Sequence, residues 1–207
     1  MAQVLSLFPT PLMQCPQLID ATQAQSLRER FIREAALPNH RDSALAHSQI
    51  IDPADDPALA ALARRLLPEV VEMGRLMFGE TLPWAIKEMW ANVLQTGAHQ
   101  AVHNHANCFV SGVVYLSEVD ASAQTRFIRS LGGRDFVFSN SHAGTVTGAF
   151  NADKWIGPTP AIGDAVLFPS SLLHEVPPNR GGLRVSIAFN AIPRRLDAWG
   201  YGLSFSA

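Results

Sequence analysis

The stretch WAIKEMWANVLQTGAHQAVHNHANCFVSGVVYL, residues 84–116, decides the fold. Within it, Ile86, Trp90 and Leu94 recur at even spacing, and residues 109–116 are apolar and rich in β-branched side chains. A period of two residues is the pattern of a strand with one buried face. The stretch therefore predicts two strands, separated by a polar segment that contains three histidines.

Short strand patterns continue towards the C-terminal end of the chain. Clusters of Gly, Pro, Ser and Asn separate them, and such clusters are typical of turns. Strands are expected at residues 85–94, 109–116, 125–129, 135–138, 165–168 and 184–190. Residues 139–160 are the least regular stretch, and a loop of that length often serves as a lid or substrate loop.

The first third of the chain has helical periodicity instead. A first helix is expected from a cap at Asp20 or Thr22 to about Leu37, just before a proline. Its apolar stripe contains Leu27 and Phe31, which are four residues apart. The N-terminal part of the chain is therefore expected to pack as a helix against the strands that follow.

A second helix is expected to begin at Asp56-Pro57 and to end at Gly79. An acidic cap followed by proline at the first helical position is a typical start, and glycine is a typical terminator. Pro68 is expected to kink or split this helix. Proline removes one backbone hydrogen bond and clashes with the preceding turn.

The change from helical to strand periodicity after Pro83 predicts an α+β protein whose β part is a sandwich or jelly roll. We expect two facing antiparallel sheets with the helices packed outside. The chain is interpreted as one domain over residues 1–207. Its helical part would span about residues 15–80 and its β core about residues 85–190. A chain of 207 residues can bury a sizeable core.

The composition excludes several classes of protein. Hydrophobic residues make up 47% of the chain and charged residues 16%, which indicates a globular protein rather than a disordered one. The formal net charge is −2 without a basic block, so no nucleic-acid partner is expected. No apolar run could span a membrane, and the N-terminal residues lack the pattern of a signal peptide. With only two cysteines, a cytoplasmic protein without a disulfide scaffold is expected.

Three histidines form the strongest chemical signal. His103 and His105 are two residues apart, so on a strand their imidazoles would lie on one face. His174 follows a strongly apolar strand pattern much later in the chain. Two near ligands and one distant ligand, with coordination positions left open, are typical of a catalytic non-haem iron site.

Several spaced motifs occur in the order found in a known family. The first group is Trp90-Ala91-Asn92-Val93, Gly97, Gln100, His103-Asn104-His105 and Ser111-Gly112-Val113-Val114-Tyr115-Leu116. The second group is Pro160, Gly163-Asp164, Leu167-Phe168-Pro169-Ser170, His174, Val176, Pro178-Asn179 and Arg184-Val185-Ser186-Ile187-Ala188-Phe189-Asn190. With these motifs the chain resembles the 2-oxoglutarate/iron(II)-dependent oxygenases, in a bacterial and phage-like subgroup related to prolyl hydroxylases.

This resemblance covers nearly the whole chain and implies a double-stranded β-helix, which is a cupin-like jelly roll. It implies iron(II) as cofactor, 2-oxoglutarate as cosubstrate and O2 as oxidant. His103 and His174 would be two of the iron ligands. His105 would occupy the slot where the wider superfamily has Asp or Glu. A second assignment puts Asn107 in that slot and makes His105 the first ligand.

The resemblance also implies a cosubstrate site. Arg184 lies ten residues after His174, as the cosubstrate-binding arginine does in this superfamily, and Ser186 lies on the same strand face. Arg184 would pair with the far carboxylate of 2-oxoglutarate through two N–H bonds. Tyr115 either packs in the core or contacts 2-oxoglutarate. Asn92 and Asn190 either satisfy a neighbouring backbone group or line the pocket.

The sequence therefore predicts an oxygenase that couples oxidative decarboxylation of 2-oxoglutarate to hydroxylation of a second substrate. No catalytic residue is expected beyond the metal ligands, because the metal supplies the redox chemistry. The alternative is a cupin-like protein that binds iron or zinc through three histidines without using 2-oxoglutarate. The substrate would be a small molecule or a peptide. Residues 117–160 are expected to shape the end of the pocket that binds it. A homodimer is as compatible with the sequence as a monomer.

Overall fold

The computed structural model describes residues 2–35, 37–39, 42–131, 140 and 142–206. Its strands are β1 (Met13–Cys15), β2 (Leu37–Asn39), β3 (Asp42–His47), β4 (Trp84–Leu94), β5 (Gln100–His103), β6 (Val110–Tyr115), β7 (Arg126–Ile128), β8 (Lys154–Ile156), β9 (Ala165–Pro169), β10 (Leu173–Val176), β11 (Arg184–Pro193), β12 (Arg195–Ala198) and β13 (Tyr201–Ser204). Its helices are α1 (Ala21–Glu34) and α2 (Pro57–Phe78), with short 3-10 turns at Pro53–Asp55 and Ala121–Ala123.

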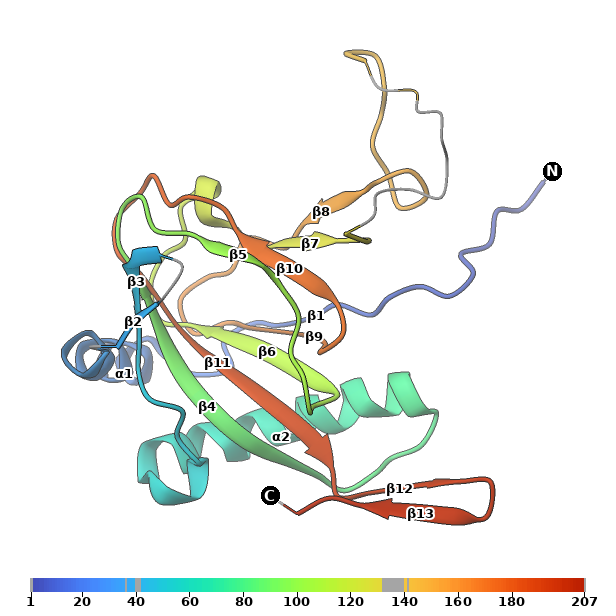
Figure 1. The fold of residues 1–207 in the computed structure, drawn as a ribbon, viewed down its shortest axis with the longest axis horizontal. Coiled ribbons are helices and arrows are strands. Elements are labelled where there is room, and N and C mark those ends of the chain that lie inside the picture. The colour runs from blue at the N-terminus through green and yellow to red at the C-terminus, as the bar shows by residue number, and fades with distance from the viewer. Residues whose placement is uncertain (1, 36, 40–41, 132–139, 141, 207) are drawn as a thin grey trace.

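Two antiparallel sheets face each other in the described part of the chain (Figure 1). The larger sheet has seven strands in the order β1-β9-β6-β11-β4-β3-β2, and the smaller has four in the order β5-β10-β7-β8. β12 and β13 form a separate hairpin. This is a double-stranded β-helix, so the predicted α+β jelly roll is confirmed.

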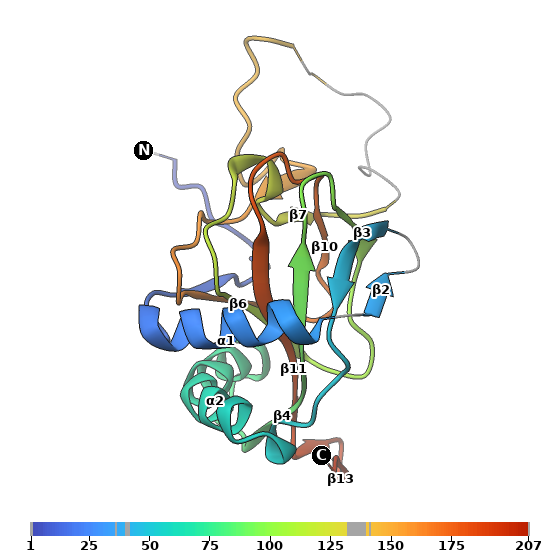
Figure 2. The ribbon, with the colours of Figure 1, turned by 90° about the vertical axis from the view of Figure 1, so that its left-hand side faces the viewer.

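Both helices lie on the outer face of the larger sheet (Figure 2). α2 contacts β4, β6 and β9, and α1 contacts β4 and β11. Because side chains alternate along a strand, one face of β11 directs Val185, Ile187 and Phe189 into the core shared with the helices. The other face of the same strand is therefore turned towards the smaller sheet. Among the described residues, no helix has the length and apolar character needed to cross a membrane.

The first helix begins where the sequence predicts but ends earlier. Asp20 is the cap, and its carboxylate accepts from the backbone N–H of Gln23, whose side chain accepts in turn from the backbone N–H of Asp20. This reciprocal pair fixes the start at Asp20 rather than at Thr22. The helix ends at Glu34, and Leu37 belongs to β2 instead. The expected end at about Leu37 is therefore wrong, because pairing with β3 competes with the last helical turn.

The second helix runs from Pro57 to Phe78 through Pro68 without a break, so the expected split is wrong. An interior proline costs about 3 kcal/mol. Leu66 and Val70 flank it and are both fully buried, and each such side chain contributes about 1.5–3 kcal/mol. Packing against the sheet thus offsets the cost of the proline.

The expected strands appear as β4, β6, β7, β9 and β11, with ends shifted by one to three residues. The expected strand at residues 135–138 lies outside the described residues. Several strands were not predicted from the sequence, and these are β1, β2, β3, β5, β8, β10, β12 and β13. Each has three to six residues. Such segments are too short to establish a period, and they are strands because a neighbour pairs with them.

Candidate metal centre

The inner face of the larger sheet carries polar side chains in register. Ser186 on β11 lies between Asn92 on β4 and Tyr115 on β6. Further along the same face, Asn190 lies between Glu88 on β4 and Ser111 on β6. Polar groups on a buried sheet face are costly unless they have partners. The face that looks towards the smaller sheet is therefore built for a function other than packing.

Three imidazoles meet between the two sheets. His103 is the last residue of β5 and is the register partner of His174 on β10, while His105 follows β5. One ligand atom from each of the three lies within 4.8 Å of the others. The backbone N–H of His105 donates to the carbonyl of Ser170 at 3.0 Å, which fixes this residue beside the pair. One metal ion could contact all three imidazoles.

Hydrogen bonds to Nδ1 set the tautomer of each histidine. The Nδ1 atoms of His103 and His174 lie 2.8 and 2.9 Å from the carbonyl oxygens of Ala101 and Leu172. A carbonyl can only accept, so each Nδ1 carries the proton and each Nε2 keeps a lone pair. The Gln100 side-chain N–H lies 3.3 Å from Nε2 of His103, as expected if that atom accepts. Orientation through the second ring nitrogen is typical of metal-binding histidines.

The electrostatics of the cluster favour neutral imidazoles. Burial, followed by the nearby His103, lowers the pKa of His174 to about 3. Burial also lowers the pKa of His105. A protonated imidazole cannot bind a metal, so low pKa values keep these ligands available at neutral pH.

Aromatic side chains surround the three histidines. The ring of Phe168 lies 4.7 Å from that of His174, and Phe127 lies 6.3 Å from it. Trp90 on β4 lies 5.6 Å from the ring of His105. These apolar rings exclude water and lower the local dielectric, which strengthens the electrostatic interactions of anything bound there.

Arg184 is a buried cation on the inner face of β11. Its residue is 3% exposed, and its Nε is buried without a hydrogen-bond partner. Its Nη1 donates to the Ser186 hydroxyl at 3.3 Å, and its guanidinium carbon lies 5.4 Å from the centroid of the Tyr115 ring. Burial lowers the pKa of Arg184, while contact with Tyr115 raises it. In the described part of the chain no carboxylate pairs with this guanidinium, so the site fits an incoming anion.

The remaining predicted residues separate into two groups. Tyr115 lies beside Arg184, and its hydroxyl is 3.3 Å from that of Thr125. Asn92 is buried and is the register partner of Ser186. Asn190, by contrast, lies at the histidine end, where its Oδ1 is 2.6 Å from Nδ1 of His105.

Asn107 is exposed and adopts a left-handed backbone conformation with a φ of 57°. The three-histidine cluster contains both His103 and His105, as the first of the two assignments predicts. Sequence reasoning missed Glu88, and it quoted Gln100, Ser111 and Ser170 as motif residues without assigning a role to them. A signal for Glu88 was present, because a carboxylate two residues before Trp90 falls on the same face of an apolar strand.

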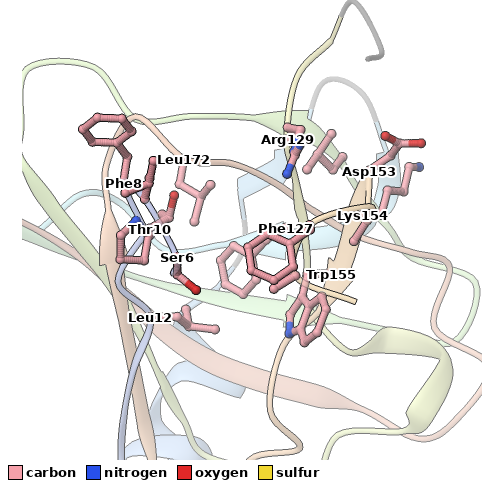
Figure 3. A pocket seen from close by; sticks show the side chains of 16 residues that line it. Ser6, Phe8, Thr10, Leu12, Phe127, Arg129, Asp153, Lys154, Trp155 and Leu172 are labelled. Carbon is pink, nitrogen blue, oxygen red and sulfur yellow. The ribbon is translucent and has the colours of Figure 1, made fainter. Parts of the chain in front are cut away.

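A cavity of about 460 Å³ opens beside the smaller sheet (Figure 3). Phe127 and Trp155 are register partners on β7 and β8 and form one wall, while Phe8 and Leu12 come from the N-terminal segment. Arg129 adds a cation to this lining. The ring of Phe127 lines the cavity and also lies next to the ring of His174. One side chain therefore stands between the cavity and the histidine cluster.

The sequence matches a known protein family at these residues. The family is described as "Putative 2OG-Fe(II) oxygenase", and the match covers residues 88–190, which include the three histidines, Arg184 and Ser186. This chain belongs to the 2OG-Fe(II) oxygenase family. A comparison with curated protein sequences gave no match.

Solved structures of 2OG-Fe(II) oxygenases share the fold. HygX from Streptomyces hygroscopicus, solved with nickel and 2-oxoglutarate, is 16% identical with a TM-score of 0.63, over 89% of this chain and 83% of HygX. A Pseudomonas putida prolyl-4-hydroxylase is 19% identical with a TM-score of 0.63, over 89% of this chain and 94% of the hydroxylase. The epimerase SnoN from nogalamycin biosynthesis is 15% identical with a TM-score of 0.60, over 90% of this chain and 80% of SnoN. At these identities the likeness establishes the fold.

Proposed function

We propose that this oxygenase couples the oxidative decarboxylation of 2-oxoglutarate to the hydroxylation of a small-molecule substrate. One observation carries the proposal. Three imidazoles converge between the two sheets, and the larger sheet buries the guanidinium of Arg184, which has no acidic partner among the described residues. A metal site on one sheet and an anion site on the facing sheet are what this reaction requires.

His103, His105 and His174 would hold the iron. A three-nitrogen donor set fits iron(II) and leaves coordination positions open for the cosubstrate and O2. The bound iron would supply the redox chemistry. The chain would contribute the orientation of the ligands, through the hydrogen bonds to Nδ1, and an aromatic wall that keeps water out.

Arg184 and Ser186 would bind the far carboxylate of 2-oxoglutarate. The guanidinium can donate two parallel N–H bonds to a carboxylate, and the hydroxyl adds a third donor. Tyr115 would support the guanidinium with its ring, and Asn92 would line the same pocket from β4. A buried arginine that lacks an anion is costly, so binding the cosubstrate would relieve that cost.

The cavity lined by Phe127 and Trp155 would receive the primary substrate. Two structural neighbours act on or bind small molecules by their descriptions: HygX was solved with hygromycin B bound, and SnoN belongs to nogalamycin biosynthesis. A volume of about 460 Å³ lies within the usual range of small-molecule pockets. Aromatic walls together with two cations, Arg129 and Lys154, and one carboxylate, Asp153, favour an apolar ring system that carries polar or charged substituents.

The alternative, a three-histidine metal protein that does not use 2-oxoglutarate, is not favoured. A metal-binding module has no need of the buried guanidinium of Arg184, which would remain a cost without a benefit.

An anaerobic iron(II) titration with and without 2-oxoglutarate tests the proposal. Iron(II) alone should bind without colour, and addition of 2-oxoglutarate should produce a metal-to-ligand charge-transfer absorption that saturates at one equivalent. Succinate in place of 2-oxoglutarate is the control, because it lacks the keto acid group that chelates iron. Iron binding without the new absorption would favour the metal protein instead.

A further inference from the structure

A hydrogen-bonded chain connects His105 to a carboxylate on the neighbouring strand. The Nδ1 atom of His105 lies 2.6 Å from Oδ1 of Asn190, and Nδ2 of Asn190 lies 2.6 Å from Oε1 of Glu88. Asn190 and Glu88 are register partners on β11 and β4, so the sheet itself sets this spacing. Of the three histidines, His105 is the one connected to this hydrogen-bonded chain, because the Nδ1 atoms of His103 and His174 lie against backbone carbonyls.

The direction of each bond in this chain is determined by chemistry. An ionised carboxylate only accepts, so the Asn190 amide must turn its N–H2 towards Glu88. Its oxygen then faces His105, which must donate from Nδ1. The Ser111 hydroxyl also donates to this oxygen at 2.7 Å, and the Ser170 hydroxyl lies 2.8 Å from that of Ser111. The arrangement fixes the tautomer of His105 with the proton on Nδ1.

The hydrogen-bonded chain also places a negative charge near the metal site. Three neutral imidazoles bring no negative charge to a divalent cation. Glu88 places a carboxylate two hydrogen bonds away from Nδ1 of His105, on a side chain that is 21% exposed. Lys87 opposes this effect, because its Nζ lies 3.2 Å from the same Oε1 atom.

We propose that Glu88 is a positioning residue for the metal centre, which acts through Asn190 to orient and polarise His105. The outer carboxylate offsets part of the metal charge that an all-histidine ligand set leaves uncompensated. The inference rests on the proposed function for the identity of the metal.

Metal affinity of single variants tests the charge. Glu88→Gln keeps an acceptor oxygen and removes the charge. Its iron(II) affinity, measured by anaerobic competition, should fall about tenfold, which is the lower end of the range for residues that hydrogen-bond to metal ligands. Asn190→Ala breaks the chain and should weaken iron(II) binding by about 10- to 100-fold. Lys87→Met removes the opposing cation and should tighten binding. Glu72→Gln, on an exposed part of α2, makes the same charge change as Glu88→Gln and should leave affinity unchanged.

Nitrogen NMR of the metal-free protein provides a second readout. In the wild type and in Glu88→Gln, the His105 ring should be protonated at Nδ1 alone, whereas Asn190→Ala should give a mixture of tautomers. A purely structural role would not give opposite signs for Glu88→Gln and Lys87→Met. Equal iron(II) affinity in Glu88→Gln and Glu72→Gln would overturn the inference.

The two proposals fail separately. If the wild type binds iron(II) but not 2-oxoglutarate, the proposed function is wrong and the role of Glu88 stands on the affinities. If the wild type binds both and Glu88→Gln matches it, only the role of Glu88 is lost. A wild type that binds no iron(II) would overturn both.

Discussion

At the scale of single residues, variants of Arg184 best distinguish an oxygenase that uses 2-oxoglutarate from a protein that only binds a metal. Arg184→Ala should weaken 2-oxoglutarate binding while iron(II) binding stays nearly intact. Removing one partner of a buried charge pair costs about 2–5 kcal/mol, or roughly 30- to several-thousand-fold in affinity. Arg184→Lys should restore only part of the loss, because lysine keeps the charge without the two-pronged geometry. Anaerobic calorimetry on iron-loaded protein measures both.

Arg180→Ala is the matched control for that experiment, because Arg180 is exposed and lies only four residues earlier. It should bind 2-oxoglutarate like the wild type. An Arg184→Ala variant with unchanged 2-oxoglutarate affinity would contradict the assignment of the carboxylate site.

Gly112 on β6 is required by packing rather than by backbone conformation. A Cβ at this position would overlap the buried ring of Phe189 and lie 2.9 Å from the carbonyl oxygen of Val166. Gly112→Ala should therefore lower the free energy of unfolding by about 1–3 kcal/mol, as overpacking in cores does. Urea denaturation measures the loss. Gly182→Ala has no neighbour within 4 Å of its new Cβ and should change stability by less than about 0.5 kcal/mol.

At the scale of elements, Asp56 stabilises the start of α2 in two ways. Its Oδ1 accepts from the backbone N–H groups of Ala58 and Leu59, and its Oδ2 forms an ion pair with Arg30 of α1. Asp56→Ala should cost about 0.5–2 kcal/mol for the cap. Asp56→Asn keeps a good cap and should lose only the ion pair, so it should be the milder of the two. At pH 7 the free energy of unfolding should be highest for the wild type, lower for Asp56→Asn and lowest for Asp56→Ala.

The contribution of Asp56 should also depend on pH. The hydrogen bond from Arg30, followed by those from the backbone of α2, lowers the pKa of Asp56 in the folded protein. A group with a lowered folded pKa stabilises the protein above its unfolded pKa of about 3.9, and this stabilisation is lost as pH falls through the folded pKa. The stability gap between wild type and Asp56→Asn should therefore be constant from pH 7 to about 5 and shrink below about 4. A gap that widened on acidification would contradict the ion pair.

At the scale of the whole molecule, iron(II) and 2-oxoglutarate should stabilise the fold jointly. The proposed ligands come from β5, β10 and β11 and from the segment after β5, so bound groups would connect both sheets. A ligand at one hundred times its Kd contributes about 2.7 kcal/mol, or about 5–11 °C in Tm for a chain of this size. Anaerobic scanning calorimetry should show a rise with iron(II) and a further rise with 2-oxoglutarate. In Arg184→Ala the first rise should remain and the second should shrink.

The sequence by itself determined the class of the fold, and it predicted the three histidines that the structure brings together. The period-two pattern of residues 85–94 and 184–190 is local and strong, because each strand has one face on the helices and one towards the smaller sheet. The helix starts at Asp20 and Asp56 are also local, since a cap needs only the next three residues. His103, His105 and His174 could be proposed as ligands from the sequence because few residue types bind metals and these three occur in the order of a known family.

Only the tertiary structure decided which polar residues act together. The sequence grouped Asn190 with Arg184, but the β11–β4–β6 register puts Asn190 between Glu88 and Ser111 and so beside His105. β5 and β10 have four residues each and carry too little local pattern to be predicted, yet their pairing brings His103 opposite His174. Register is set by the pairing of distant segments and by which face is buried. A local pattern contains neither, so the sequence could place Glu88 on the face of Trp90 but could not show that Asn190 lies opposite it.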